Sequence, residues 1–225
     1  MATKTKKKLS RRARHQQIIR RRRIVLGVGA VVIALLLVLI IHSLYIRFKP
    51  KADVSTLTIK EDGVKLEELI DTNELSASKG DLKSSIKEDI AKFNEKYGKG
   101  AAHFVRIGEK NGKCYVETTF KDVKTYAKYT GYDVKLTKVK ASKANFDAIF
   151  SKVKDGKKKG FVEQYKVKKM KGQLLILNEN ITVKVPGDVK CVSDEGTKIN
   201  EDGSVTIKPV NGDNDFAVNT YIIFE

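Results

Sequence analysis

One long apolar run divides the chain into two polar parts. Residues 24–41 contain no charged side chain, and residues 42–46 extend the run to 23 positions. A helix of about 20 apolar residues is needed to cross the roughly 30 Å hydrocarbon core of a bilayer. The run therefore predicts a transmembrane helix over residues 24–46.

The charges that flank this run predict its orientation. Residues 1–23 hold 11 Lys/Arg and no acidic residue, whereas residues 47–51 hold three basic residues. An excess of Lys/Arg marks the cytoplasmic side of a membrane. We therefore expect a basic cytoplasmic tail (1–23), a linker (47–53) and an extracytoplasmic domain (54–225), with Arg20, Arg21, Arg22 and Arg23 at lipid headgroups.

The run does not match a cleaved signal peptide or a lipid anchor. A signal peptide has a shorter apolar core followed by a small-residue cleavage site, and neither is present. A lipoprotein needs a cysteine at the end of the run, where residues 42–51 have none. The sequence thus predicts an uncleaved signal-anchor and a single-pass protein of the cell membrane.

Apolar residues recur at helical spacing in three later segments. The clearest is residues 79–97, where Leu82, Ile86, Ile90, Phe93 and Tyr97 form one stripe. Ser78 can cap this helix, and Gly98 can end it. Residues 122–129 and 143–153 are expected to form two shorter helices.

Alternation of apolar and polar residues predicts strands elsewhere. Asn111-Gly112 is a strong hairpin signal between two of them, and residues 155–160 are expected to be an exposed loop. The expected strands are residues 54–60, 64–70, 101–107, 113–120, 133–139, 161–168, 173–177, 181–185, 189–192, 205–207 and 220–224. The pattern is that of an α+β fold: a mostly antiparallel sheet with about three helices, preceded by the transmembrane helix.

The net charge of +18 is concentrated near the N-terminus. Residues 1–51 contribute 14 of these charges, and the remaining 31 Lys/Arg against 27 Asp/Glu leave a net charge of +4. The basic character therefore indicates topology, and we expect no specific nucleic-acid partner. Residues 121–171 are an exception within the domain, because they hold 16 lysines against five acidic residues.

Within residues 121–171, the part with the most closely spaced lysines is a candidate polyanion-binding surface. Phe161 and Tyr165 lie among its lysines, as in surfaces that bind polyanions. The alternative is an ordinary solvated surface. The absence of arginine from residues 107–225 argues against specific phosphate recognition, which uses the planar guanidinium group. The candidate residues are Lys152, Lys154, Lys157, Lys158, Lys159, Lys166, Lys168, Lys169 and Lys171.

The sequence contains few residues that could form a metal site or a catalytic site. Cys114 and Cys191 are interpreted either as a disulfide or as two buried thiols, and with one histidine after residue 46 they cannot complete a four-ligand zinc site. We therefore expect no metal, cofactor or catalytic residue. Glu67 and Glu68 are adjacent, so their side chains should point apart, toward solvent.

Several segments resemble a group of uncharacterised extracytoplasmic proteins of clostridia-type Firmicutes. They are residues 56–63 (TLTIKEDG), 93–98 (FNEKYG), 122–131 (DVKTYAKYTG), 183–187 (VKVPG), 192–194 (VSD) and 221–224 (YIIF). Many members of that group resemble lipoproteins with a cysteine anchor, which this chain lacks. The resemblance implies a Gram-positive surface protein and implies no activity.

These observations favour a non-enzymatic, membrane-anchored envelope module that binds an anionic wall polymer through the lysines. Two alternatives stay open. One is an accessory subunit that partners another membrane protein, and the other is a hydrolase with an unrecognised carboxylate site. The oligomeric state cannot be read from the sequence.

Overall fold

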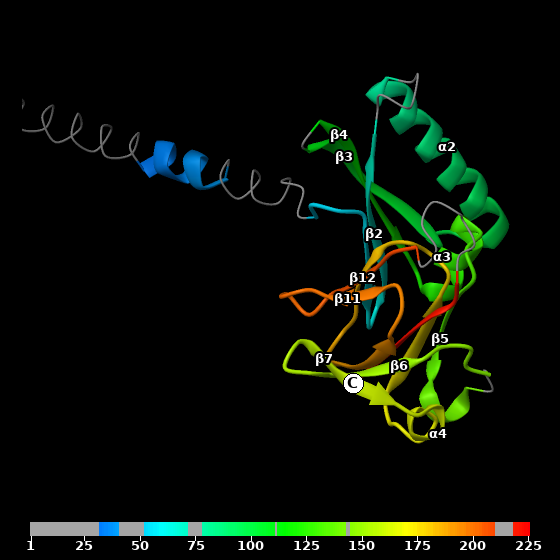
Figure 1. Ribbon diagram of the computed structural model, residues 1–225. Helices are drawn as coiled ribbons and strands as arrows, with labels where there is room; N and C mark the ends of the chain where they lie inside the picture. The colour runs from blue at the N-terminus through cyan, green and yellow to red at the C-terminus, as the bar shows by residue number, and fades with distance from the viewer. Residues whose placement is uncertain (1–31, 41–51, 72–77, 111, 143–144, 210–217) are drawn as a thin grey trace, which may run out of the picture. The chain divides into compact units, whose positions relative to one another are not determined.

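The computed structural model describes residues 32–40, 52–71, 78–110, 112–142, 145–209 and 218–225. The chain divides into two units, Met1–Lys49 and Pro50–Glu225. Figure 1 shows the second unit with its strands and helices labelled. Strands β1 to β13 all belong to this second unit.

The transmembrane prediction is contradicted. Within the expected span the described residues, 32–40, are helical. Across the described residues no helix is both long enough and apolar enough to cross a bilayer. Residues 24–31 and 41–46 of the expected span lie outside the described residues, as do Arg20, Arg21, Arg22 and Arg23. The signal-anchor and single-pass predictions depend on this span and are therefore not supported either.

The second unit is α+β, with two sheets where the sequence suggested one. The first has the order β11-β12-β9-β1-β2-β4-β3, and the second has the order β5-β8-β13-β10-β6-β7. Pairing is antiparallel throughout except between β1 and β9. The strands of the first sheet are β1 (Thr56–Lys60), β2 (Gly63–Ile70), β3 (Ala102–Lys110), β4 (Lys113–Phe120), β9 (Thr182–Lys184), β11 (Thr197–Ile199) and β12 (Val205–Ile207). Those of the second are β5 (Val134–Lys138), β6 (Phe150–Lys154), β7 (Lys157–Val162), β8 (Gln173–Leu177), β10 (Val189–Ser193) and β13 (Thr220–Phe224).

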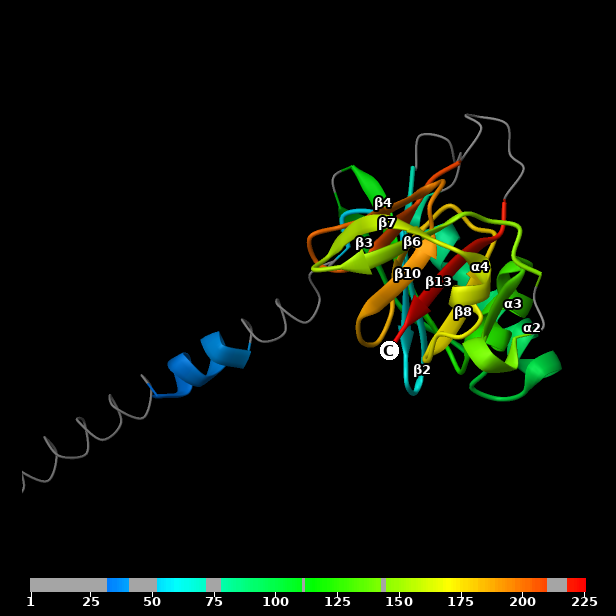
Figure 2. The ribbon, with the colours of Figure 1, turned by 60° about the horizontal axis from the view of Figure 1, so that its bottom comes forward.

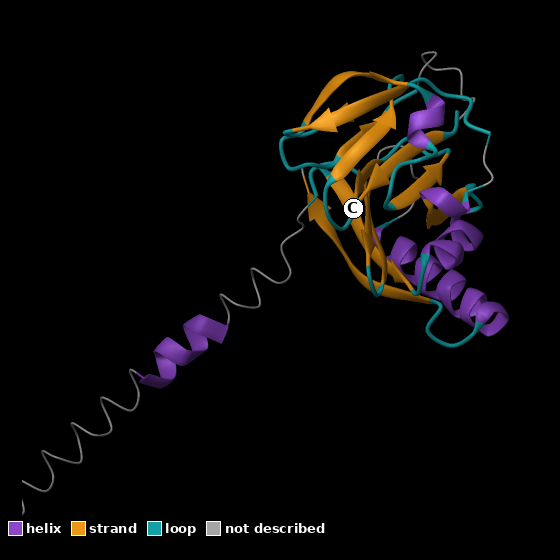
Figure 3. Cartoon of the chain, turned by 90° about the horizontal axis from the view of Figure 1, so that it is seen from below, coloured by secondary structure: helices purple, strands orange, loops and turns teal. Residues whose placement is uncertain are grey.

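The helices are α2 (Lys79–Tyr97), α3 (Val123–Thr130), a 3-10 turn η1 (Val139–Ala141) and α4 (Gln164–Val167). The prediction for residues 79–97 is confirmed, including the cap: the Ser78 hydroxyl accepts from the Asp81 amide while Asp81 bonds back to Ser78. In Figure 3 the helices of this unit lie along one side of the strands.

The second unit has two hydrophobic cores. The main core contains side chains from both sheets and from α2 and α3, among them Leu57, Val183, Leu175, Ile222 and Ile90. The second core covers the other face of the six-stranded sheet, where α4 and neighbouring residues pack on it (Figure 2). Its buried members are Val139, Phe146, Phe150, Val167, Leu174, Cys191, Tyr221 and Ile223.

Strand β13 contributes to both cores because its side chains alternate. Ile222 and Phe224 enter the main core, whereas Tyr221 and Ile223 enter the second. All five residues of this strand are buried. A strand buried on both faces reads as a continuous apolar run, and Tyr221-Ile-Ile-Phe224 is such a run.

Between residues 145 and 162 the apolar pattern predicted the wrong secondary structure. A helix was predicted for residues 143–153, but Phe150–Lys154 form β6, and residues 143–144 lie outside the described residues. Phe146 and Phe150 are buried in the same core, as the predicted helix would have required. They reach it differently, because Phe146 lies in an irregular segment and Phe150 begins a strand. The expected loop at residues 155–160 is a tight turn followed by β7.

The cysteines are two free, buried thiols, so the disulfide alternative is wrong. Cys114 lies on β4 of the seven-stranded sheet, and Cys191 lies on β10 of the six-stranded sheet. Burial raises the pKa of Cys191 to about 12, which keeps the thiol protonated and unreactive at neutral pH.

Glycine is required between β9 and β10. Gly187 has φ = +90°, and a Cβ atom there would overlap the carbonyl oxygen of Glu225. Gly203 also has a positive φ, of +77°, but a Cβ atom there meets nothing within 4 Å. We expect Gly203→Ala to lower the free energy of unfolding by about 1–2 kcal/mol through backbone strain. Gly187→Ala should cost about 1–3 kcal/mol more, because the terminal strand must also move.

Urea denaturation of both variants checks this expectation. Equal losses of unfolding free energy in Gly187→Ala and Gly203→Ala would show that the approach of Glu225 to this turn does not constrain the fold.

Candidate functional site

The nine candidate lysines lie on the β6–β7 hairpin of the six-stranded sheet and on α4 and the segment that follows it. Lys152 and Lys154 are on β6, and Lys157, Lys158 and Lys159 are on β7. The other four lie on α4 or between α4 and β8. We call these nine residues the lysine surface.

Strand pairing places several of these lysines on one face. Lys152 pairs with Cys191, a member of the second core, so Lys152 points to the face that α4 covers. Lys154 is two residues further along β6 and pairs with Lys157, which places both on the same face. The structure thus brings these three lysines and the α4 lysines to one side of the sheet, whereas Lys158 pairs with a main-core residue of β6 and faces the other side.

Two members of the lysine surface are engaged by the protein itself. Lys158 is half-buried, and its ammonium group donates to the carbonyl oxygen of Asp194 and lies 3.6 Å from its carboxylate. Lys166 forms an ion pair of 2.6 Å with Glu163. Among the described residues the other seven make no ion pair: Lys152, Lys154, Lys157, Lys159, Lys168, Lys169 and Lys171.

Aromatic rings lie among these lysines. The Tyr165 ring has the ammonium groups of Lys166 and Lys169 each 5.5 Å from its centre, within the range of a cation–π contact. Tyr165 is 55% exposed, and Phe161 is 76% exposed. Both aromatic residues are therefore accessible to a partner.

A groove of about 590 Å³ adjoins the lysine surface. Its walls are the β6–β7 turn, the segment that joins β9 to β10, and the turn before β12. Apolar side chains line part of it: Val153, Val185, Val189 and Ile199. Lys154 belongs to both the groove and the lysine surface.

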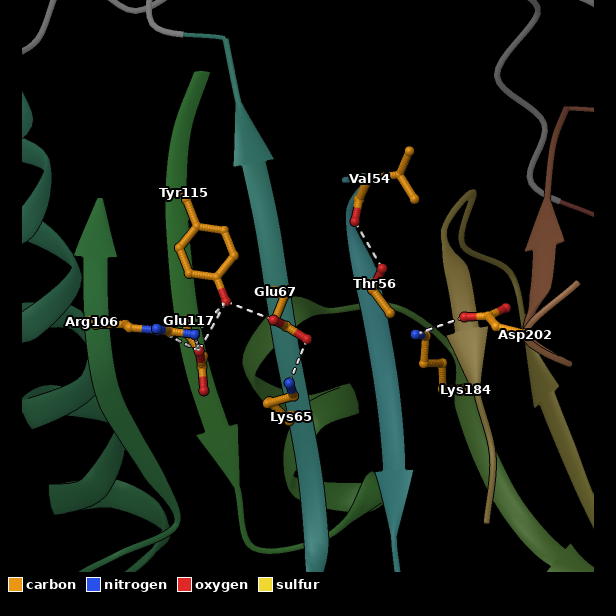
Figure 4. Close-up of polar contacts among 9 residues, drawn as sticks. All are labelled: Val54, Thr56, Lys65, Glu67, Arg106, Tyr115, Glu117, Lys184 and Asp202. Atoms are coloured by element: carbon orange, nitrogen blue, oxygen red, sulfur yellow. Dashed lines mark hydrogen bonds and ion pairs between the residues drawn. The ribbon is translucent and has the colours of Figure 1, made fainter. Parts of the chain in front are cut away.

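The charges in this groove are largely neutralised. Lys184 pairs with Asp202 at 2.8 Å, as Figure 4 shows, and Lys190 pairs with Asp188 at 3.1 Å. Hydrogen bonds from Lys184 and Ser204 lower the pKa of Asp202 to about 2. Asp202 is therefore ionised at any physiological pH and cannot serve as a proton donor there. The sequence did not predict these pairs. The partners of the first pair are 18 residues apart, those of the second are two residues apart, and in each pair the partners lie on different elements.

Glu67 and Glu68 point apart, as expected for adjacent residues on a strand. The expectation that both face solvent is wrong for Glu67, which is 3% exposed. Figure 4 shows it in a network with Lys65, Tyr115, Glu117 and Arg106. Because both carboxylates are paired with a cation, the network has no net charge.

The Tyr115 hydroxyl is the centre of this network. Its oxygen lies 2.6 Å from Glu67 Oε1 and 2.9 Å from Glu117 Oε2, so its single proton serves two carboxylates. Arg106 bonds Glu117 at 2.6 Å, and Lys65 bonds Glu67 at 2.5 Å. Burial opposes ionisation of Glu67, yet the bonds from Lys65 and Tyr115 outweigh it and lower its pKa. We interpret the network as structural, since it joins β2, β3 and β4.

Glu68 faces the other side of β2, toward Glu179. The Tyr126 hydroxyl on α3 donates to Glu179 Oε2 at 2.5 Å. Burial, with a smaller effect from the Glu68 charge, raises the pKa of Glu179 to about 7; burial also raises the pKa of Glu68. Across the described residues no group of three or more His, Cys, Asp or Glu side chains is placed to hold a metal ion.

Comparisons with protein-family models, with curated proteins and with solved structures found no match to this chain.

The position of Glu179 predicts a pH dependence of stability. Between pH 4.5, its ordinary pKa, and about 7, the folded protein holds a proton that the unfolded chain has released. The free energy of unfolding should therefore fall as the pH rises through this range, by about 3 kcal/mol at most. Glu179→Gln keeps an acceptor for Tyr126 but cannot ionise, so it should reduce this fall.

Urea unfolding of the protein and of Glu179→Gln at several pH values between 4 and 8 is the measurement. The same pH profile for both proteins would show that Glu179 does not carry the buried proton.

Proposed function

We propose that the second unit is a binding domain for an extended anionic polymer, such as a cell-wall polymer, and that it binds through the lysine surface. The observation that carries the proposal is a set of seven lysines, on the β6–β7 hairpin and in the segment after α4, for which the described residues provide no carboxylate partner. Residues 150–171 hold nine lysines against two acidic residues, Asp155 and Glu163.

The spread of these charges favours a polymer over a small anion. Lys152, Lys154 and Lys157 line a sheet face, and four more lysines follow on and after α4. The lysines of this surface are exposed except for Lys158, so no enclosed pocket gathers them around one ligand. A flexible chain of charges can contact them in series, and each contact releases counterions.

The chemistry of lysine limits the selectivity of such binding. An ammonium group acts as a point charge, whereas arginine offers a planar fork that matches phosphate or carboxylate. With no arginine after Arg106, affinity should follow the charge density of the polymer and depend strongly on salt. Exposed Tyr165 adds a flat apolar contact beside the charges.

The second unit can be tested without residues 1–49, whose basic tail would itself attract polyanions. Both cores consist of residues between Leu57 and Phe224, and Pro50–Glu225 forms one compact unit. Circular dichroism and a cooperative urea transition establish that it is folded before binding is measured.

The triple variant Lys152→Gln, Lys154→Gln, Lys157→Gln should weaken binding of residues 50–225 to labelled polyphosphate and poly-glutamate by about tenfold or more. Each lost contact removes counterion release, so the slope of log affinity against log salt should decrease by about two. Fluorescence anisotropy between about 50 and 200 mM salt measures both quantities.

The matched control is Lys79→Gln, Lys83→Gln, Lys99→Gln, which removes the same charge from exposed positions on and after α2. Equal weakening by both triple variants would show that net charge, and not the lysine surface, attracts the polymer. Binding that does not respond to salt would exclude the proposal altogether.

A further inference from the structure

Strand β7 is one of the two edges of the six-stranded sheet. It pairs only with β6, and its other backbone edge pairs with no strand among the described residues. An edge of this kind offers alternate N–H and C=O groups to another chain. Lysines are a common protection of such edges, and β7 begins with three of them, Lys157, Lys158 and Lys159.

Phe161 does not fit a purely protective role. It is 76% exposed, which is the largest exposure of any large apolar side chain described in the structure. It pairs with Ser151, and so points to the face opposite the one that carries Lys154 and Lys157. Exposing a phenylalanine at a sheet edge favours association.

A second apolar residue lies on the same face. Ile149 precedes β6 and is 58% exposed; its carbonyl accepts from the Asp194 amide at 2.7 Å, which continues the pairing of β6 with β10. By alternation Ile149 points with Ser151, and therefore with Phe161.

The two faces of the β6–β7 edge therefore differ in chemistry. One face presents Lys152, Lys154 and Lys157. The other presents Phe161 and Ile149, together with Lys158, whose ammonium group is engaged by Asp194. An added strand sends alternate side chains to the two faces. Its complement is a segment in which acidic and apolar residues alternate, with the acidic residues against the lysines and the apolar residues against Phe161.

A second copy of this chain is a poorer occupant. Two β7 strands paired edge to edge would bring six lysines together, and the strand itself contains no acidic residue to balance them. Like charges across paired strands are destabilising. Charge complementarity thus favours an acidic partner over self-association.

We propose that β7 is a strand-addition site, which takes an extended peptide segment of alternating acidic and apolar residues as a further strand of the six-stranded sheet. Main-chain hydrogen bonds to β7 provide affinity, and the two faces provide selectivity. This goes beyond polymer binding, which needs neither the backbone edge nor Phe161.

The probe is a labelled peptide of alternating Glu and Val, about ten residues long, within the usual length of a strand. Two further versions carry N-methyl groups on all valines or on all glutamates. In a strand, alternate residues direct their N–H groups to the same side, so one version should lose binding to residues 50–225 and the other should retain it. Equal binding of all three peptides would overturn the proposal, because attraction by charge alone does not depend on N–H groups.

Side-chain variants test the apolar face. Phe161→Ser should weaken peptide binding by about tenfold or more and leave polyphosphate binding unchanged. The control, Tyr165→Ser, removes another exposed aromatic ring that is not on β7 and should leave the peptide affinity unchanged. Equal peptide affinity of Phe161→Ser and the unchanged protein would contradict strand addition. Sedimentation equilibrium that finds a dimer, abolished by Phe161→Ser, would also overturn it and assign the edge to a second copy.

Discussion

Burial of β13 on both faces is the constraint on which the second unit depends. Ile222 packs in the main core between the sheets, while the next residue, Ile223, packs in the second core under α4. Successive side chains of a strand point to opposite faces. A shift of β13 by one residue would therefore move the side chains of each core to the wrong face of the sheet. The neighbouring strand β8 repeats this arrangement, with Leu175 paired to Ile222 and Leu174 paired to Ile223.

The lysine surface lies where this double burial ends. Along the six-stranded sheet the order runs from β13 through β10 and β6 to β7. Phe150 still belongs to the second core and Val153 to the main core, but most of β7 is exposed. The β6–β7 hairpin therefore extends beyond the cores and can carry charge without a desolvation cost. Both proposed binding modes use this hairpin, through different groups: side-chain charges for the polymer, and the backbone edge with Phe161 for the peptide.

Buried carboxylates are compensated differently on the two faces of the seven-stranded sheet. On one face Glu67 and Glu117 each pair with a cation and accept from the Tyr115 hydroxyl, which offsets their burial. Glu68 and Glu179 form no ion pair with any cation among the described residues, and burial raises the pKa of both. Two adjacent residues of one strand thus differ in environment because they face opposite sides of the same sheet.

Local patterns in the sequence were sufficient for most elements. The stripe ending at Tyr97 and the cap at Ser78 determine α2, Asn111-Gly112 marks the β3–β4 turn, and short apolar runs identify β8 and β13. These signals succeed because periodicity and turn chemistry act within a few residues. They failed for residues 145–153, where apolar spacing suited a helix although the residues around Phe150 form a strand. They also failed for residues 164–167, which were expected in a strand and form α4.

Only the tertiary structure decided how these elements combine. The apolar run at residues 24–46 met the length and hydropathy criteria for a membrane span, yet no described helix meets them. The division into two sheets, the meeting of Glu68 with Glu179 across more than a hundred residues, and the pairing of Lys158 with Asp194 depend on long-range contacts. The sequence by itself determined that lysines are dense between residues 152 and 171. Strand pairing decided which of them share a face, since a side chain's direction depends on register and on the neighbouring strands.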